Sequence, residues 1–310
     1  MSVSAKVFTK ETVIDGETTR LKCVEIDGQT FFLSRGLATV ARVEDDWYDD
    51  VKDPHAAIAG LQRSRARADV FTFWQRLPHI EPRFSFRTEW ASIAALPVTT
   101  FDYWLNKQIK PTARNKVRKA WKSGVEVREV RYDDDFVRGM TDIFNETPIR
   151  QGRRFWHYGK DFETVKRQFS RSLFREDLLG AYHGDELIGF VMLGNAGSYG
   201  VLGQIVSKIR HRDKGPNNAL IAKAVEVCER KGLPHLVYAY WGDGSLMDFK
   251  RSNGFEEIRL PRYYVPLTRW GQLIIHAGLH RGWKACLPDS LKSRLKTVRN
   301  HWRSRNGAQP

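Results

Sequence analysis

Apolar and polar positions alternate over short stretches in the first third of the chain, a pattern typical of β-strands. Residues 5 to 33 contain three such stretches, and the Asp27-Gly28 pair between the last two is typical of a two-residue hairpin turn. Residues 53 to 68 predict a helix, and the apolar run at residues 70 to 74 predicts a strand. The chain therefore begins as a mixed α/β region.

Two helices and a strand are predicted in the middle of the chain. Residues 100 to 106 and 112 to 123 have helical patterns, and Gly124 stands where a glycine commonly ends a helix. Residues 125 to 130 alternate strictly between apolar and polar side chains, which indicates a half-buried strand.

Three strands joined by tight turns are predicted between residues 179 and 206. The Gly184-Asp185 pair separates the apolar runs at residues 179 to 183 and 187 to 193, as in a hairpin. A second turn at residues 195 to 200 leads to the third strand, which ends near residue 206.

A basic loop then leads into a helix that continues to Arg230. Pro216 fits the first turn of that helix, where its missing N–H costs nothing. We expect the N–H groups of Asn217 and Asn218 to point outward, surrounded by positive side chains. These are Lys208, Arg210, Arg212 and Lys214. Free N–H groups, the helix dipole and basic side chains together favour binding of a phosphate group.

The last part of the chain predicts a strand at residues 236 to 241, a helix from Ser245 and a final strand after Gly254-Phe255. Beyond Pro266, two helices with apolar stripes and strongly basic faces are expected. The stripes contain Trp270, Leu273, Ile274, Ala277 and Trp283 in the first, and Leu291, Leu295, Val298 and Trp302 in the second. This tail, residues 269 to 305, would either bind an anionic membrane surface or dock on the protein itself.

Composition adds charge and location to this picture. The net charge is +15, which favours a polyanionic partner or an anionic surface. The three cysteines lie far apart in the sequence, so neither a disulfide framework nor a metal site is indicated. The first residues have no apolar core of a secretory signal, and no apolar run approaches the roughly 18 residues that span a bilayer. We expect a cytoplasmic protein, with attachment to the inner face of the membrane as an alternative.

The order of elements from residue 125 to 268 resembles the GNAT superfamily of N-acyltransferases. There the strand-to-helix loop reads Arg/Gln-x-x-Gly-x-Gly/Ala and holds the CoA pyrophosphate; residues 212 to 217 match the Arg and the first Gly but have Asn217 at the second small position. The resemblance implies an α/β (α+β) fold, with a mixed, mostly antiparallel sheet flanked by helices. Many members also have a general-acid Tyr where this chain has Lys250.

A second likeness divides the chain. The basic segment from residue 114 to 127 resembles the FemAB-like branch of the fold, which adds a degenerate N-terminal half-domain and includes enzymes that transfer aminoacyl groups from tRNA. We therefore predict a supporting half-domain at residues 1–124, an acyltransferase domain at 125–268 and a basic helical tail at 269–310.

The resemblance implies an acyl-CoA (acetyl-CoA) donor along a splayed strand and the basic loop. The residues predicted to hold it are Gln204, Ile205, Val206, Arg212, Lys214, Gly215, Asn217 and Asn218. The loop at residues 145 to 158 would border an amine acceptor, with substrate contacts from Arg150, Gln151, Arg153, Arg154, Tyr158 and Trp241. Arginines can bind phosphate or carboxylate there, but the aromatic residues of that loop could equally be packing.

The catalytic candidates are the proton acceptors Glu146 and His157 and the proton donor Lys250. For Lys250 we favour the alternative that it is an exposed helix residue. Asp243 to Ser245 fits a helix N-cap better than a catalytic site. Acyl transfer to an amine requires neither a covalent enzyme nucleophile nor a metal.

Three functions remain open from the sequence. The first is an N-acyltransferase acting on a small-molecule or cell-envelope amine, including polysaccharide precursors. The second, less favoured, is a tRNA-dependent aminoacyl transferase, because nine Lys/Arg cluster between residues 107 and 131. The third is a non-catalytic, membrane-peripheral scaffold that has kept the fold, to which Asn217 and Lys250 would point.

Overall fold

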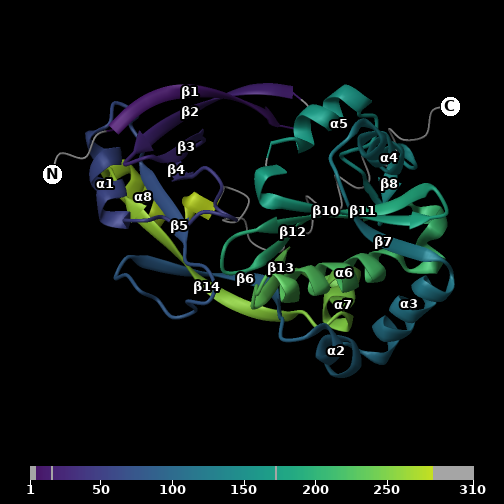
Figure 1. Cartoon of the computed structure of the whole chain (residues 1–310). Helices are drawn as coiled ribbons and strands as arrows, with labels where there is room; N and C mark the ends of the chain where they lie inside the picture. Colours follow the sequence, from purple (N-terminus) through teal and green to yellow (C-terminus); the bar gives the residue numbers. More distant parts are fainter. Residues whose placement is uncertain (1–4, 15–16, 172, 282–310) are drawn as a thin grey trace.

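One twelve-stranded, mostly antiparallel sheet forms the centre of the protein, and helices pack against it (Figure 1). The computed structural model describes residues 5–14, 17–171 and 173–281. The strand order is β1-β2-β3-β4-β5-β14-β6-β13-β12-β11-β10-β7. The predicted α/β class with a mixed, mostly antiparallel sheet is confirmed.

The N-terminal part contains five strands and one helix. These are β1 (Ala5–Ile14), β2 (Glu17–Ile26), β3 (Gln29–Arg35), β4 (Thr39–Val43), α1 (Pro54–Arg63) and β5 (Val70–Trp74). The Asp53 carboxylate caps α1 by accepting the N–H groups of His55 and Ala56 at 2.9 and 3.1 Å. The helix ends at Arg63, before the predicted residue 68, because Ser64 is extended. The β1–β2 hairpin arches towards α5 (Phe162–Phe169) in Figure 1.

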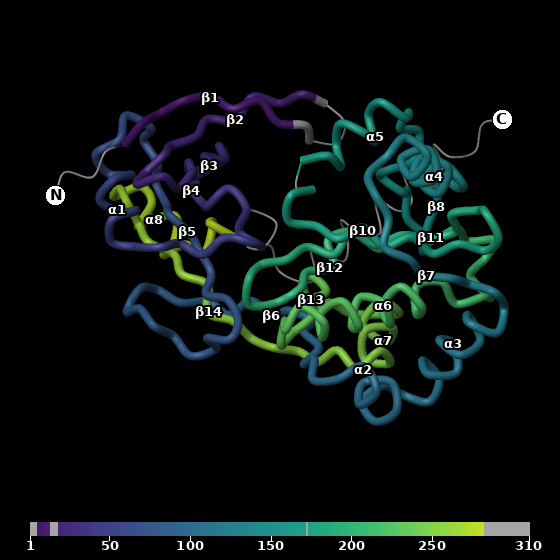
Figure 2. The backbone as a smooth tube through the Cα atoms, in the orientation of Figure 1, coloured from purple at the N-terminus to yellow at the C-terminus, as the bar shows by residue number. Residues whose placement is uncertain are grey.

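Residues 87 to 122 connect the N-terminal strands β1 to β5 with the strands that follow residue 124. They form β6 (Arg87–Pro97), α2 (Phe101–Tyr103), a π-helical segment (Trp104–Gln108) and α3 (Pro111–Lys122). The strand β6 lies between β14 and β13, as the chain trace in Figure 2 also shows, and Val117 of α3 shares a core with Leu220. The sheet is continuous across the predicted domain boundary at residue 124, because β6 from the first part lies between β13 and β14. Whether the two parts fold as separate domains stays a prediction.

The remaining elements follow the predicted order. They are β7 (Val125–Val130), α4 (Asp134–Asn145), β8 (Ile149–Arg150), β9 (Arg153–Arg154), α5, β10 (Glu176–His183), β11 (Glu186–Asn195), β12 (Gly200–Ser207), α6 (Pro216–Arg230), β13 (His235–Tyr240), α7 (Gly244–Ser252) and β14 (Glu256–Pro266). Both predicted hairpins are present, since β10 pairs with β11 and β11 with β12. Gly184 in the first turn has φ +61°, a conformation that glycine adopts easily.

The strands β12 and β13 separate after a short parallel contact. They pair only at Gly200 with Leu236 and at Val201 with Val237. Gly203 is the extra residue of a bulge in β12, because Met192 pairs with Gln204 and Leu193 with Leu202. The splayed strand that the resemblance implies is therefore present at residues 202 to 206, where β12 and β13 no longer pair.

The chain returns to the N-terminal part at α8 (Arg269–His276). Ile274 and Ile275 of this helix are buried, and a Cβ on Gly271 would lie 1.9 Å from the Asp69 carbonyl oxygen, so the helix is docked closely. The predicted first tail helix thus ends at His276, with Gly278 at φ +70° beyond it. The second predicted helix and Trp283 lie outside the described residues. Within the described part of the chain, no helix has the length and apolar character needed to cross a membrane.

Candidate functional site

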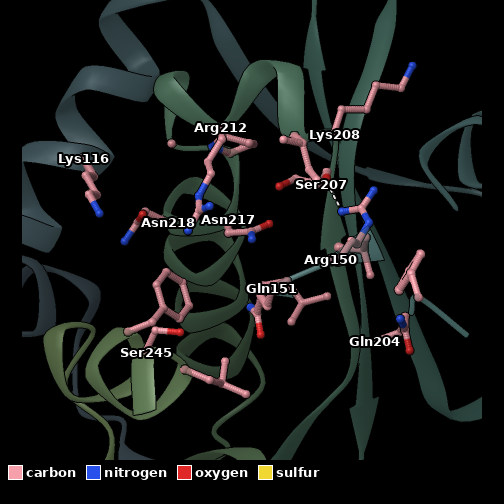
Figure 3. Close-up of a pocket in the computed structure, with 18 of the residues that line it drawn as sticks. Lys116, Arg150, Gln151, Gln204, Ser207, Lys208, Arg212, Asn217, Asn218 and Ser245 are labelled. Atoms are coloured by element: carbon pink, nitrogen blue, oxygen red, sulfur yellow. Dashed lines mark hydrogen bonds between the residues drawn. The ribbon is translucent and has the colours of Figure 1, made fainter. Parts of the chain in front are cut away.

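A cavity of about 430 Å³ occupies the opening between β12 and β13 (Figure 3). It brings together ten of the residues predicted for donor and acceptor binding. These are Gln204, Ile205, Val206, Arg212, Gly215, Asn217, Asn218, Arg150, Gln151 and Arg154. Residues of the two predicted sets therefore line the same cavity. The predicted residues Lys214, Arg153, Tyr158 and Trp241 do not line it.

The start of α6 forms one end of this cavity. Gly215 has φ +72°, and a Cβ there would lie 3.0 Å from the Lys116 carbonyl oxygen, so α3 packs directly against the turn. The Asn218 N–H is donated to the Gly215 carbonyl at 3.0 Å. The prediction that this N–H points outward is wrong, because the chain turns tightly at Gly215 and closes an early hydrogen bond.

The two asparagines at this helix start have different roles. The Asn218 side chain is buried and donates to Asn253 Oδ1 at 2.9 Å, so it fixes α6 to α7. The Oδ1 atom of Asn217 is buried without a hydrogen-bond partner in the described part of the chain. Asn217 therefore has an unused hydrogen-bond acceptor at the start of α6.

Positive side chains surround the cavity from three parts of the chain. Lys116 on α3, Arg154 on β9 and Arg212 before α6 are exposed residues that line it. By contrast, Lys208 donates to Glu186 at 2.5 Å, and Arg210 contacts the same carboxylate. Although burial opposes it, these hydrogen bonds lower the pKa of Glu186 to about 2. Glu186 thus partly neutralises the positive charge predicted around the loop. Lys116, which was not predicted, adds a positive charge to the cavity.

Glu146 anchors the loop that precedes α6. Its carboxylate accepts the N–H groups of Ile209 at 2.5 Å and Arg210 at 2.9 Å. It also contacts the Arg150 guanidinium at 3.3 Å, and that guanidinium donates to the carbonyl of Ser207 at 2.6 Å (Figure 3). These contacts favour an anchoring role for Glu146 over the predicted role of catalytic proton acceptor, because its oxygens hold the backbone.

His157 is also unsuited to accept a proton. Its ring is fully buried and stacks on Phe144 with the ring centres 4.2 Å apart. Burial lowers the pKa of His157 to about 3, so the ring stays neutral at physiological pH. Its Nε2 lies 3.3 Å from the Gln204 amide nitrogen, so His157 positions Gln204, which lines the cavity. The packing alternative for this loop holds for the partly buried Phe155, whereas Trp156 and Tyr158 are exposed.

Lys250 is buried, contrary to the expectation of an exposed helix residue. Only 2% of it is accessible, and its Nζ donates to the Tyr240 carbonyl at 2.6 Å. It lies 4.6 Å from the ring centre of Tyr238, which lines the cavity. Burial lowers the pKa of Lys250 to about 8. Lys250 thus packs against Tyr238, a residue of the cavity wall. The pattern of apolar and polar residues in the predicted helix did not indicate this burial.

The neighbouring predictions have mixed outcomes. Trp241 is buried and its ring lies against the Arg251 guanidinium, so its role is packing. Asp243 stands at the N-cap of α7, as predicted, but its side chain makes no capping hydrogen bond. Ser245 and Phe249 of α7 line the cavity and were not predicted to do so. Among the described residues, no group of three or more His, Cys, Asp or Glu side chains is placed to hold a metal.

Comparison with solved structures identifies the fold. The chain is similar to FemX, with TM-score 0.55, 12% identity, and coverage of 82% of this chain and 88% of FemX. It is similar to the C-terminal domain of a protein described as a lysylphosphatidylglycerol synthetase from Agrobacterium fabrum, with TM-score 0.54, 13% identity, and coverage of 81% and 85%. L-PGS from Bacillus licheniformis matches with TM-score 0.50, 13% identity, and coverage of 78% and 82%.

These likenesses show that the chain shares the fold of FemX and of the synthetase domain, which agrees with the FemAB-like fold that the sequence predicted. At such low identity they define the fold and not the reaction. No protein-family model matches the sequence, and no curated protein matches it closely enough to count as a relative.

Proposed function

We propose that the protein is an acyltransferase that binds a phosphate-bearing acyl donor in the cavity between β12 and β13 and passes the acyl group to an amine. One observation carries this proposal: the parted strands open onto a cavity bordered by Lys116, Arg154 and Arg212. Unpaired backbone along β12 can bind the acyl carrier, while the cations and the start of α6 bind its phosphates.

Two carriers share this chemistry, acyl-CoA and aminoacyl-tRNA. The size of the cavity suits the compact phosphates and pantetheine of CoA, and acetyl-CoA is the simplest such donor. The tRNA alternative is supported by α3, whose exposed face adds Arg118, Lys119 and Lys122 beside Lys116. It also draws on the lysylphosphatidylglycerol synthetase neighbour, whose name describes an aminoacyl group joined to a lipid. A cell-envelope amine or lipid is the class of acceptor that we favour.

The donor is tested by thermal stability and calorimetry with acetyl-CoA and, separately, aminoacylated total tRNA. A ligand that binds only the folded protein raises its stability. We expect Arg212→Ala and Lys116→Ala to weaken binding about tenfold each, since each removes a cation next to a phosphate. Lys119→Ala is the matched control for CoA, because Lys119 lies on the same helix but outside the cavity.

The two carriers are separated by this series. Loss of tRNA binding in Lys119→Ala and Lys122→Ala, together with a steep dependence on salt, would identify tRNA as the donor. Gly215→Glu should abolish binding of either carrier, because it places bulk and negative charge at the start of α6. Full binding by a folded Gly215→Glu variant would overturn the assignment of the cavity.

A further inference from the structure

A second cavity, of about 380 Å³, adjoins the first at Gln204, which lines both. Its wall comes from the loop after β4, the end of α5, the start of β10 and the bulge of β12. The bulge residue Gly203 is part of the lining, so the missing side chain leaves the cavity open to β12 at this point. An acyl group held along β12 in the first cavity would reach the second one here.

A third cavity, of about 620 Å³, continues from the second. Glu44, Asp45, Tyr48 and Arg171 line both of them. The β1–β2 hairpin reaches α5 (Figure 1), and Arg171 donates to Thr12 Oγ1 at 2.7 Å. The three cavities therefore follow one another from the proposed donor site to the junction between the N-terminal strands and α5.

Charge changes sign between the first two cavities. Among the described residues that line them, the first cavity has cations, whereas the second has four carboxylates, Glu44, Asp45, Asp46 and Glu176, against the single cation Arg171. Glu44 pairs with Lys10, and Asp46 lies 3.9 Å from Arg262. Within the described part of the chain, Asp45 and Glu176 make no ion pair, and burial raises the pKa of both. A positively charged ligand would relieve the cost of burying these groups.

Glu176 is held beside the bulge. Tyr48 donates its hydroxyl to Glu176 Oε1 at 3.2 Å, while Glu176 Oε2 is buried and has no hydrogen-bond partner among the described residues. A Cβ built on Gly203 would lie 3.9 Å from Glu176 Oε1 and 3.7 Å from the Tyr48 hydroxyl. One carboxylate oxygen is thus oriented by Tyr48, and the other remains for a ligand next to β12.

We propose that the second cavity binds the acceptor, that the acceptor carries a protonated primary amine, and that Glu176 is the base that receives a proton from it. This inference rests on the acyl transfer proposed above, because it places the second substrate of that reaction. It assigns donor and acceptor to adjoining cavities that meet at Gln204.

The proposed step conserves atoms and charge. The ammonium group gives one proton to the Glu176 carboxylate, and the nitrogen lone pair forms a bond to the acyl carbon. The bond from that carbon to the carrier's sulfur or oxygen breaks, and the leaving atom takes the second proton lost by the nitrogen. Glu176 then releases its proton to solvent.

The test uses calorimetry of the full chain with two matched probes, L-lysine amide and norleucine amide. Both are acetylated on the α-nitrogen, so that only the lysine side chain carries a protonated amine. We expect L-lysine amide to bind the wild type more tightly than norleucine amide. Glu176→Gln keeps the size of the side chain and an acceptor for Tyr48, and should weaken L-lysine amide binding at least about tenfold. Glu163→Gln, an exposed glutamate of α5 outside the cavities, is the control and should not change it.

Donor binding separates this inference from the proposed function. Acetyl-CoA or tRNA should bind Glu176→Gln as it binds the wild type, which also shows that the variant is folded. Unchanged L-lysine amide binding in Glu176→Gln, equal binding of norleucine amide, or no binding of either probe would overturn the acceptor site. Loss of donor binding in the Arg212 and Gly215 variants would still support the donor site in each of these cases.

Discussion

The Nζ atom of Lys250 lies 2.6 Å from the Tyr240 carbonyl oxygen and links α7 to the irregular end of β13. The pairing of β13 with β6 is interrupted between Val237 and Tyr240, and Ala239 has φ +51°, an unusual value for a residue with a side chain. Tyr238, which lines the proposed donor cavity, lies inside this interruption. A buried lysine therefore holds the strand in the shape that the cavity requires.

This lysine predicts a specific dependence of stability on pH. Burial lowers the pKa of Lys250 from 10.5 to about 8 in the folded protein. Between these values the unfolded chain binds more protons than the folded one, so the contribution of Lys250 to stability rises as pH rises. Urea unfolding of the wild type and Lys250→Met at pH 7 to 10.5 should show the difference in unfolding free energy moving in favour of the wild type. A difference that stays constant over this range would contradict a lowered pKa.

A second prediction concerns Glu146 as an anchor and not a base. Glu146→Ala leaves the N–H groups of Ile209 and Arg210 without their acceptor, which should cost about 2 kcal/mol of unfolding free energy and weaken donor binding. Glu146→Gln keeps one acceptor oxygen and should lose less of both. Denaturant unfolding and calorimetry measure these effects. If Glu146→Gln kept stability and donor affinity but lost turnover, Glu146 would have to be a base after all.

The third prediction is that two arginines of the neighbouring loop have different roles, one in stability and the other in donor binding. Arg150 donates to the carbonyls of Ser207 and Ile143 at 2.6 and 2.7 Å, so Arg150→Ala should destabilise the fold by about 2 kcal/mol. Arg154 is exposed and lines the donor cavity, so Arg154→Ala should change stability by less than about 0.5 kcal/mol while weakening donor binding. Thermal unfolding and donor titration of both variants test this. Equal stability losses would show that Arg154 is structural as well.

The sequence predicted correctly those turns and helix ends that depend on residues close together in the chain. The hairpin at Gly184-Asp185 and the helix start at Pro216 were found because turn residues and the first helical position have strong preferences of their own. The strand β6 was not predicted, and its position between β13 and β14 depends on pairing with segments more than 100 residues away. The pattern of apolar and polar residues does not indicate which distant strands pair with each other.

The same reason limits what the sequence predicted about the site. The cavity residues between 204 and 218 are close together in the chain, and most of them were found. Tyr48 and Glu176 are 128 residues apart, and only the packing of the loop after β4 against β10 brings them together. The burial of Lys250 likewise depends on its contacts with Tyr238 and Tyr240 of β13. A helical pattern alone does not predict such contacts.

The last prediction concerns the basic end of the chain. A truncation that tests it must leave α8 in place, because α8 buries Ile274 and Ile275 and packs against Asp69 through Gly271. A chain ending at Thr268 would lose these contacts and be destabilised whatever the tail binds. A chain ending at Arg281 keeps α8 and removes only residues 282 to 310, which contain seven Lys/Arg, one Asp and the tryptophans 283 and 302.

We expect the full chain to bind vesicles that contain anionic lipid and the chain ending at Arg281 to remain folded but lose that binding. Each Lys or Arg near such a surface contributes on the order of 1 kcal/mol, and this attraction weakens with salt. Insertion of Trp283 and Trp302 would add a part that salt does not remove, so binding should fall at high salt without vanishing. Co-sedimentation of both chains with anionic and neutral vesicles measures this, and thermal unfolding checks the fold. If the shorter chain unfolded at a much lower temperature and the full chain ignored both kinds of vesicle, residues 282 to 310 would instead dock on the protein itself.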